Sequence, residues 1–229
     1  MESTLTQKPV SSPTLVSSIA DRLRADILVG KFAPGSALRE IPLSEQYGTS
    51  RQTVREALRA LSEEGLIDLI SRRGARIPVL SPRRAREVYT LRALLEPFAV
   101  RAGLVGGMIR APEMQRIEDA FQSMVDRAEQ NDVAGMIEAD MAFHWELCSP
   151  CGHTMLLDIL KRLQIATRQS MVQMKVYGSD PLGEVESHSP ILFAVRARDA
   201  DGAAVAMRDH INTHGERLLV KLIEDSDKS

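Results

Sequence analysis

The stretch TSRQTVREALRALSEEGLIDLISRRGARI, residues 49–77, decides the fold of the first part of the chain. Its apolar residues recur at helical intervals as far as Gly65, which predicts a helix with one face in a core. Thr49 and Gln52 have the spacing of a capping box, so we expect this helix to begin at Thr49.

Three arginines form a stripe on a different face of this helix. Arg51, Arg55 and Arg59 follow one another at intervals of four residues, with no carboxylate among them. A solvated helix face is the ordinary explanation for such a stripe, so the neighbouring segments must decide its role. A short helix is predicted over Glu40–Tyr47, directly before the arginine helix and across a tight turn, as in a helix-turn-helix.

A short hairpin follows the arginine helix. Leu66–Ile70 and Ala75–Val79 predict two strands, and Arg72–Gly74 predicts a basic turn between them. A helix with an arginine stripe, followed by a basic hairpin, is typical of a recognition helix and wing. The helix can enter a major groove while the wing reaches the adjacent backbone. These features together favour binding to double-stranded DNA over a merely solvated face.

The remaining N-terminal segments complete a winged helix-turn-helix domain over residues 14–79. Apolar residues recur every four positions between Thr14 and Gly30, which predicts an amphipathic helix closed by that glycine. Residues 1–13 are rich in Ser, Thr and Pro, and we expect them to form a disordered arm.

Composition and charge are those of a globular protein with two unlike parts. Residues 1–80 carry 11 Lys/Arg and 9 Asp/Glu, whereas residues 81–229 carry 18 and 22, so the first part is mildly basic and the second acidic. This sign difference suits a part that faces DNA and a part that does not. The sequence shows no signal peptide and no apolar run long enough to span a membrane, so we expect a cytoplasmic protein.

The only two cysteines, Cys148 and Cys151, argue against a disulfide-built fold. Their CxxC spacing follows a helix instead of preceding one, which is the reverse of a redox motif, so we interpret it as incidental.

Residues 80–224 predict a mostly α second domain, an all-helical bundle with its own core. The charged tail, residues 225–229, is expected to fray. Six helices are predicted, over residues 84–105, 112–131, 132–147, 154–176, 187–198 and 200–223.

Four polar residues of this second domain could bind one metal ion. Asp140 and His144 are four residues apart on one predicted helix and so share a face, while His188 opens a later helix and His210 lies in the last one. Imidazole and carboxylate groups suit divalent transition metals, and a metal inside a bundle could bind a small carboxylate. Satisfied core or surface histidines are the alternative, and spacing alone does not exclude it.

The chain resembles the GntR superfamily of bacterial transcription regulators. The resemblance is carried by SRQTVREALRALSEEGLI with RRGARI and by the lead-in LVGKFAPGSALREIPLSEQYG. The second part resembles the FadR-type, or FCD, branch through LRALLEPFAV, DMAFH and ESHSPILFAVRARDADGAAVAMRDH. This resemblance implies a homodimer whose helical domain binds a small effector, often an organic acid, and changes the affinity for a pseudo-palindromic operator.

The resemblance also assigns individual residues of the helical domain. It implies one zinc or nickel ion per chain, with His214 as a neighbour of the site and Arg92 facing the effector pocket, where it could pair with a carboxylate. The metal ligands implied are Asp140, His144, His188 and His210.

In the DNA-binding domain the resemblance implies contacts from the recognition helix and a wing turn at Gly74 next to Arg73. Gln52 and Thr53 replace the family's usual Thr-Pro, and a glutamine can bond adenine edges, so the operator should differ from the family's commonest one. The residues assigned to DNA are Arg51, Gln52, Thr53, Arg55, Arg59, Arg73 and Gly74.

We therefore expect a ligand-responsive transcription regulator that acts as a repressor, and not an enzyme. A regulator of the same fold without a metal, sensing an acyl or larger apolar ligand, is one alternative. A metal-dependent enzyme with a DNA-binding module is another, but no unassigned carboxylate stands out as its general base.

Overall fold

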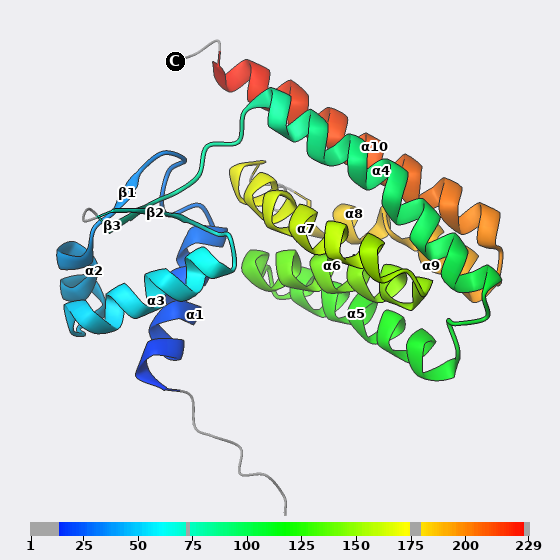
Figure 1. Cartoon of the computed structure of the whole chain (residues 1–229), viewed down its shortest axis with the longest axis horizontal. Helices are drawn as coiled ribbons and strands as arrows, with labels where there is room; N and C mark the ends of the chain where they lie inside the picture. Colours follow the sequence, from blue (N-terminus) through cyan, green and yellow to red (C-terminus); the bar gives the residue numbers. More distant parts are fainter. Residues whose placement is uncertain (1–13, 72–73, 175–179, 227–229) are drawn as a thin grey trace, which may run out of the picture.

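The computed structural model describes residues 14–71, 74–174 and 180–226. The arm predicted at residues 1–13 and the wing residue Arg73 lie outside these ranges. Figure 1 shows two parts joined by an extended segment, with a small α/β unit on one side and a helical bundle on the other. The predicted fold class is therefore confirmed.

The small unit is a winged helix-turn-helix. Its three strands are antiparallel in the order β1-β3-β2. The predicted apolar face of α3 is buried against the sheet and the other two helices. The elements are α1 (Leu15–Leu28), β1 (Ala37–Leu38), α2 (Glu40–Tyr47), α3 (Arg51–Glu63), β2 (Asp68–Ile70) and β3 (Gly74–Arg76).

The start of the recognition helix differs from the prediction. Ser50, not Thr49, is the N-cap, because its backbone is extended and its Oγ accepts the Thr53 N–H at 3.1 Å. The Thr49 N–H instead donates to the Ser44 carbonyl in the preceding turn. The Gln52 side chain donates to Glu56 one turn on, so the predicted capping box is wrong.

The sheet also differs in detail from the prediction. The two predicted strands are each reduced to three paired residues, and β1 was not predicted. A strand of two residues leaves no alternation of apolar and polar positions to detect.

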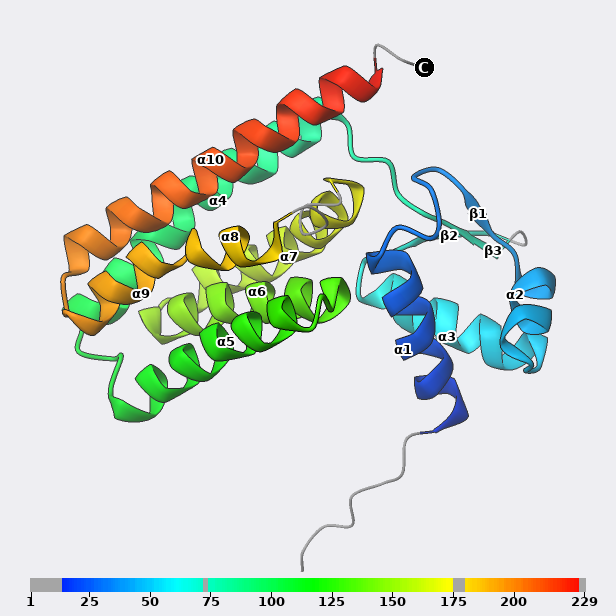
Figure 2. The same ribbon diagram turned by 180° about the vertical axis from the view of Figure 1, so that it is seen from behind.

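The larger unit is a bundle in which α4 and α10 lie side by side along their length in both Figure 1 and Figure 2. A Cβ on Gly215 of α10 would lie 2.9 Å from the Tyr89 Cβ of α4, so the glycine permits close approach of the two helices. The elements are α4 (Pro82–Val105), α5 (Ala111–Glu129), α6 (Val133–Cys148), the 3-10 turn η1 (Ser149–Cys151), α7 (Thr154–Met174), α8 (Pro181–Glu186), α9 (Ser189–Arg196) and α10 (Ala200–Ser226).

A short helix that was not predicted comes before one that was. The segment predicted as one helix from residue 187 is preceded by the short helix α8, and α9 begins only at Ser189. Pro190 explains the break, because a proline lacks an N–H and its ring would clash with the preceding turn, but it is tolerated in a first turn. His188 is thereby placed at the junction as the N-cap residue of α9.

The C-terminal helix extends further than predicted. Residues 225 and 226, expected to fray, still belong to α10. Within the described ranges, no helix is both long enough and apolar enough to cross a membrane.

Candidate metal centre and nucleic-acid interface

The structure brings the four predicted metal ligands together inside the bundle. Asp140 and His144 lie one turn apart on α6, His188 lies at the junction of α8 and α9, and His210 lies on α10. The ligand atoms of the three histidines all lie within 4.8 Å of one another. Asp140 Oδ2 is 3.1 Å from His188 Nε2, and Asp140 Oδ1 is 3.9 Å from His144 Nε2.

Neighbouring acceptors orient two of the imidazoles. His144 Nδ1 lies 2.5 Å from Glu96 Oε2, and His188 Nδ1 lies 2.9 Å from the Glu184 carbonyl oxygen. A carbonyl can only accept, and so can an ionised carboxylate, so both Nδ1 atoms donate, and in the neutral ring each Nε2 atom then carries the lone pair. Both Nε2 atoms are buried and have no hydrogen-bond partner within the described ranges.

These orphaned nitrogens are the test of whether a metal fits. His188 Nε2 faces a carboxylate oxygen at 3.1 Å, and two electron-pair donors at that distance need a proton or a metal ion between them. Ligand bonds of 2.0–2.1 Å around a tetrahedral zinc place neighbouring ligand atoms about 3.3 Å apart. The observed separations of 3.1 and 3.9 Å bracket that value, so the donor set fits a divalent transition metal.

Burial keeps His210 and His214 neutral. It lowers the pKa of His210 well below its ordinary value, and the nearby rings of His188 and His144 lower it further. Burial likewise lowers the pKa of His214 to about 4. The His214 ring centroid lies 4.4 Å from that of His210, which makes His214 a neighbour of the cluster. Neutral imidazole is the form that binds a metal.

Arg92, the predicted effector contact, lies next to the cluster but is paired within the protein. Its Nε donates to Glu96 Oε1 at 2.6 Å, and both side chains are buried. Burial raises the pKa of Glu96, but Arg92 and His144 more than offset this and hold that pKa at about 2. Glu96 is therefore ionised and accepts from both neighbours.

A small cavity of about 20 Å³ adjoins this pair. That is room for about one water molecule, so an organic acid requires the walls to move. It lies at the Arg92 and Glu96 side of His144 and is lined mainly by apolar groups. The lining residues are Arg92, Glu96, Met141, His144, Trp145, Cys148, Leu160, Leu163, Gln164 and Thr167.

The two cysteines are free and buried. Burial raises the pKa of the Cys148 thiol well above its ordinary value, so it is a poor nucleophile.

Sequence reasoning missed the residues that hold the ligands in place. Glu96 orients His144 from 48 positions away, and the carbonyl of Glu184 orients His188. The buried Glu184 carboxylate also pairs with Arg217, at 2.7 Å. The four-residue spacing of Arg92 and Glu96 was a signal for an ion pair, but nothing in the sequence linked it to His144.

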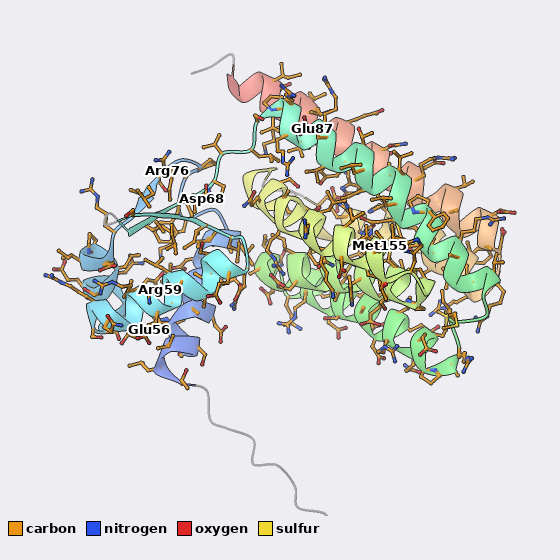
Figure 3. The ribbon with its side chains drawn as sticks, in the orientation of Figure 1. Glu56, Arg59, Asp68, Arg76, Glu87 and Met155 are labelled. Atoms are coloured by element: carbon orange, nitrogen blue, oxygen red, sulfur yellow. The ribbon has the colours of Figure 1, made fainter. Side chains whose placement is uncertain are left out.

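The recognition helix exposes its predicted DNA contacts. Arg51, Gln52, Arg55 and Arg59 are exposed and Thr53 is half-buried. Figure 3 labels Arg59 on α3, in the winged-helix unit.

The expectation that no acid compensates the arginine stripe is wrong. Glu40, in the first turn of α2, binds Arg55 through two contacts of 2.6 and 2.7 Å. The pKa of Glu40 is lowered, chiefly by this hydrogen bond from Arg55. The acid lies 15 positions before its partner, so the helical spacing on α3 could not reveal it.

The wing depends on Gly74, as predicted for its turn. Its φ is +92°, and a Cβ there would lie 2.4 Å from the Leu38 carbonyl oxygen of β1. A side chain at this position is therefore excluded by both conformation and space. Arg76 of β3, labelled with Asp68 of β2 in Figure 3, is exposed beside it.

Comparison with known proteins identifies this arrangement. A family model described as "Bacterial regulatory proteins, gntR family" matches residues 15–77, and one described as "FCD domain" matches residues 87–213. The chain belongs to the GntR family, in its FCD branch. It is a DNA-binding transcription regulator and not an enzyme.

The chain is similar to named transcription regulators over most of their length. A "Probable D-xylose utilization operon transcriptional repressor" of Paenarthrobacter nicotinovorans is 29% identical over 208 residues, covering 90% of this chain and 89% of the relative. The "HTH-type transcriptional repressor RspR" of Escherichia coli is 27% identical over 205 residues, again 90% and 89%.

Solved structures agree on the fold. A "putative transcriptional regulator GntR from Rhodococcus sp. RHA1" has a TM-score of 0.68 at 23% identity, covering 89% of this chain and 97% of that one. "E. coli McbR/YncC" also has a TM-score of 0.68, at 18% identity, covering 93% and 99%.

Proposed function

We propose that this GntR regulator is a homodimeric repressor whose helical domain binds one divalent transition metal, zinc or nickel, and a small organic acid that changes its affinity for DNA. The observation that carries the proposal is the pair of buried Nε2 atoms, on His144 and His188, that face Asp140 without a hydrogen-bond partner in the described ranges. Repression, as opposed to activation, is inferred from the two relatives named as repressors.

The metal is held by Asp140, His144, His188 and His210. When bound, it supplies an electron-pair acceptor to which a carboxylate can coordinate. Glu96 and the Glu184 carbonyl fix two of the imidazoles, which is the role that outer residues take around metal ligands.

The organic acid enters from the cavity side. Arg92 is the cation that could meet its carboxylate, but it is held by Glu96 at 2.6 Å. The acid must therefore share Arg92 with Glu96 or displace it, and its apolar portion would contact Trp145, Leu160 and Leu163. Such a rearrangement next to a metal ligand gives the effector a means of changing the bundle.

In the DNA-binding domain α3 enters the major groove. Arg51, Gln52, Thr53, Arg55 and Arg59 face the DNA from α3. The wing, with Arg73 and Gly74, approaches the neighbouring backbone.

The dimer forms through an apolar face of α4 and α7. Leu94, Phe98, Met155 and Ile159 are exposed there by 64, 55, 73 and 45%, respectively. The Phe98 ring centroid lies 6.4 Å from that of His153, which directly precedes α7. The exposed apolar side chains of α4 and α7 therefore belong to one continuous surface. Figure 3 labels Met155. An apolar face of this extent favours contact with a second copy, which would match a pseudo-palindromic operator.

Elemental analysis tests the metal site directly. Protein purified without a metal-affinity column and dialysed against zinc is expected to contain about one metal per chain. His188→Gln should lose the metal, whereas His214→Gln, the matched change of the neighbouring histidine, should keep it. Wild-type protein that takes up neither zinc nor nickel would refute the metal site and leave a metal-free sensor of the same fold.

A further inference from the structure

The candidate metal centre and the recognition helix are joined by a continuous set of side-chain contacts. We propose that Gln169 of α7 is a positioning residue that holds the C-terminal end of α3 and transmits the state of the metal centre to it. The transmission rests on the proposed function, whereas the positioning of α3 does not.

The first half of the connection lies in the bundle. From His144 Nδ1 it passes to Glu96 at 2.5 Å and from Glu96 to Arg92 at 2.6 Å. The Arg92 guanidinium lies over the Tyr89 ring, 5.3 Å from its centroid. The Tyr89 hydroxyl lies 3.2 Å from Ser170 Oγ on α7. All five side chains come from three helices that pack on one another, so a shift of the His144 ring is felt at α7.

The donors and acceptors of this half are fixed. Ser170 Oγ donates to the Thr167 carbonyl at 2.6 Å, so its lone pairs face Tyr89 and the Tyr89 hydroxyl is the donor between them. Thr167 itself lines the cavity beside Arg92. The middle of α7 therefore lines the cavity through Thr167 and, through Ser170, contacts the tyrosine that packs on Arg92.

The second half of the connection crosses from the bundle to the winged helix. Gln169, the residue before Ser170, donates from Nε2 to the Gly65 carbonyl oxygen at 2.5 Å. Gly65 is the left-handed residue that ends α3, with φ +73°, and its N–H bonds the Ser62 carbonyl. The Leu66 N–H that follows bonds the Leu61 carbonyl. The Gly65 peptide thus fixes where α3 stops and β2 begins.

The contact lies at the end of α3 opposite its DNA-facing arginines, so it can change the orientation of the helix. Gln169 and Ser170 are consecutive on one helix, so they move together when α7 shifts or rotates. The other end of α3 carries Arg51 and Arg55, which are exposed for DNA. Movement at the Gly65 end therefore changes the angle at which these arginines meet a groove.

Gln169→Leu removes the donor while keeping a similar volume, and Gln169→Lys restores one. The matched control is Gln122→Leu, because Gln122 is an exposed glutamine whose side chain donates to its own helix neighbour Asp126 in α5. Tyr89→Phe removes the hydroxyl contact to Ser170 but leaves Gln169 in place.

The first measurement is amide hydrogen exchange across residues 61–67 in metal-free protein. Gln169→Leu is expected to raise exchange there by roughly three- to ten-fold, the effect of losing one hydrogen bond, with Gln169→Lys close to wild type. Gln122→Leu should leave it unchanged. Equal exchange in Gln169→Leu and wild type would overturn the positioning role.

The second measurement repeats the hydrogen-exchange experiment in the presence of zinc. It also measures, with and without zinc, the affinity for DNA fragments that the wild type selects from a random-sequence pool. Zinc is expected to change both quantities in the wild type and in Gln122→Leu. In Gln169→Leu and Tyr89→Phe both responses should fall below a third of the wild-type response, while the Kd for zinc stays within about two-fold. The transmission is overturned if Gln169→Leu or Tyr89→Phe responds to zinc as fully as the wild type does. It is also overturned if the wild type binds zinc but neither its exchange nor its DNA affinity changes. A wild type that binds no zinc refutes the metal site instead, and the metal-free comparison still decides whether Gln169 positions α3.

Discussion

Glu96→Gln should separate the structural and the metal-related roles of one buried carboxylate. Glu96 accepts from Arg92 at 2.6 Å and from His144 at 2.5 Å, and is only 5% exposed. The change keeps the shape but removes the charge, which leaves the buried guanidinium of Arg92 without its counter-ion. Breaking a buried ion pair on one side costs about 3–5 kcal/mol, and because the new amide oxygen still accepts one hydrogen bond we expect about 3 kcal/mol.

The same change should weaken metal binding. His144 Nδ1 would lose a charged acceptor, and loss of such an outer partner reduces metal affinity by roughly 10–100-fold. Stability is measured by urea unfolding of metal-free protein, and zinc affinity by calorimetry.

Two controls make the outcome decisive. Glu138→Gln removes a carboxylate that pairs with Arg168 at 2.7 Å on the same bundle but is 41% exposed, so it should cost no more than about 1 kcal/mol. The double change Arg92→Met with Glu96→Gln removes the stranded cation and should recover part of the lost stability. If Glu96→Gln destabilises the protein no more than Glu138→Gln does, the reasoning about the buried pair is refuted.

Three further predictions concern DNA, the wing and the dimer. Arg55→Ala should weaken binding to selected DNA by about 1–3 kcal/mol in fluorescence anisotropy, whereas Glu40→Gln, which releases Arg55 from its intramolecular partner, should not; equal losses would mean that the pair only ties α2 to α3. Gly74→Ala should destabilise the winged helix by about 1–3 kcal/mol in urea unfolding, because its φ is +92° and the new Cβ would lie 2.4 Å from the Leu38 carbonyl oxygen of β1. Gly48→Ala should destabilise it less, because the φ of Gly48 is also positive but its surroundings are open. Phe98→Glu should convert dimers to monomers in light scattering, and an unchanged mass would place any dimer interface elsewhere.

The elements of this fold could be predicted where the signal is local. The helices α1 and α2 and the apolar face of α3 follow directly from residue spacing and from closing glycines. Local signals also compete, and adjacent Thr49 and Ser50 could both cap a helix. Only the turn after α2, which takes the Thr49 N–H, decides between them in favour of Ser50.

The candidate site was predictable only in part, because only some of its contacts lie within one helix. Asp140 and His144 share a helix, so their spacing brings them together. His188 and His210 were candidates without such a spacing, and the family resemblance assigned them as ligands beside the first two. Glu96 was not foreseen because its contact with His144 depends on how α4 packs against α6. The pairing of Arg55 with Glu40 is equally a product of packing, here between α2 and α3.

The side-by-side arrangement of α4 and α10 has a consequence for synthesis of the chain. Along its length α4 packs against α10, which leaves the ribosome after every other described element and carries His210. The winged helix, by contrast, has its described strands and helices between Leu15 and Arg76 and can fold as soon as they emerge. A nascent chain therefore acquires its winged helix well before the cluster of Asp140 and the three histidines can be assembled. A chain truncated within α10 before His210 would keep the winged helix but could not form that cluster.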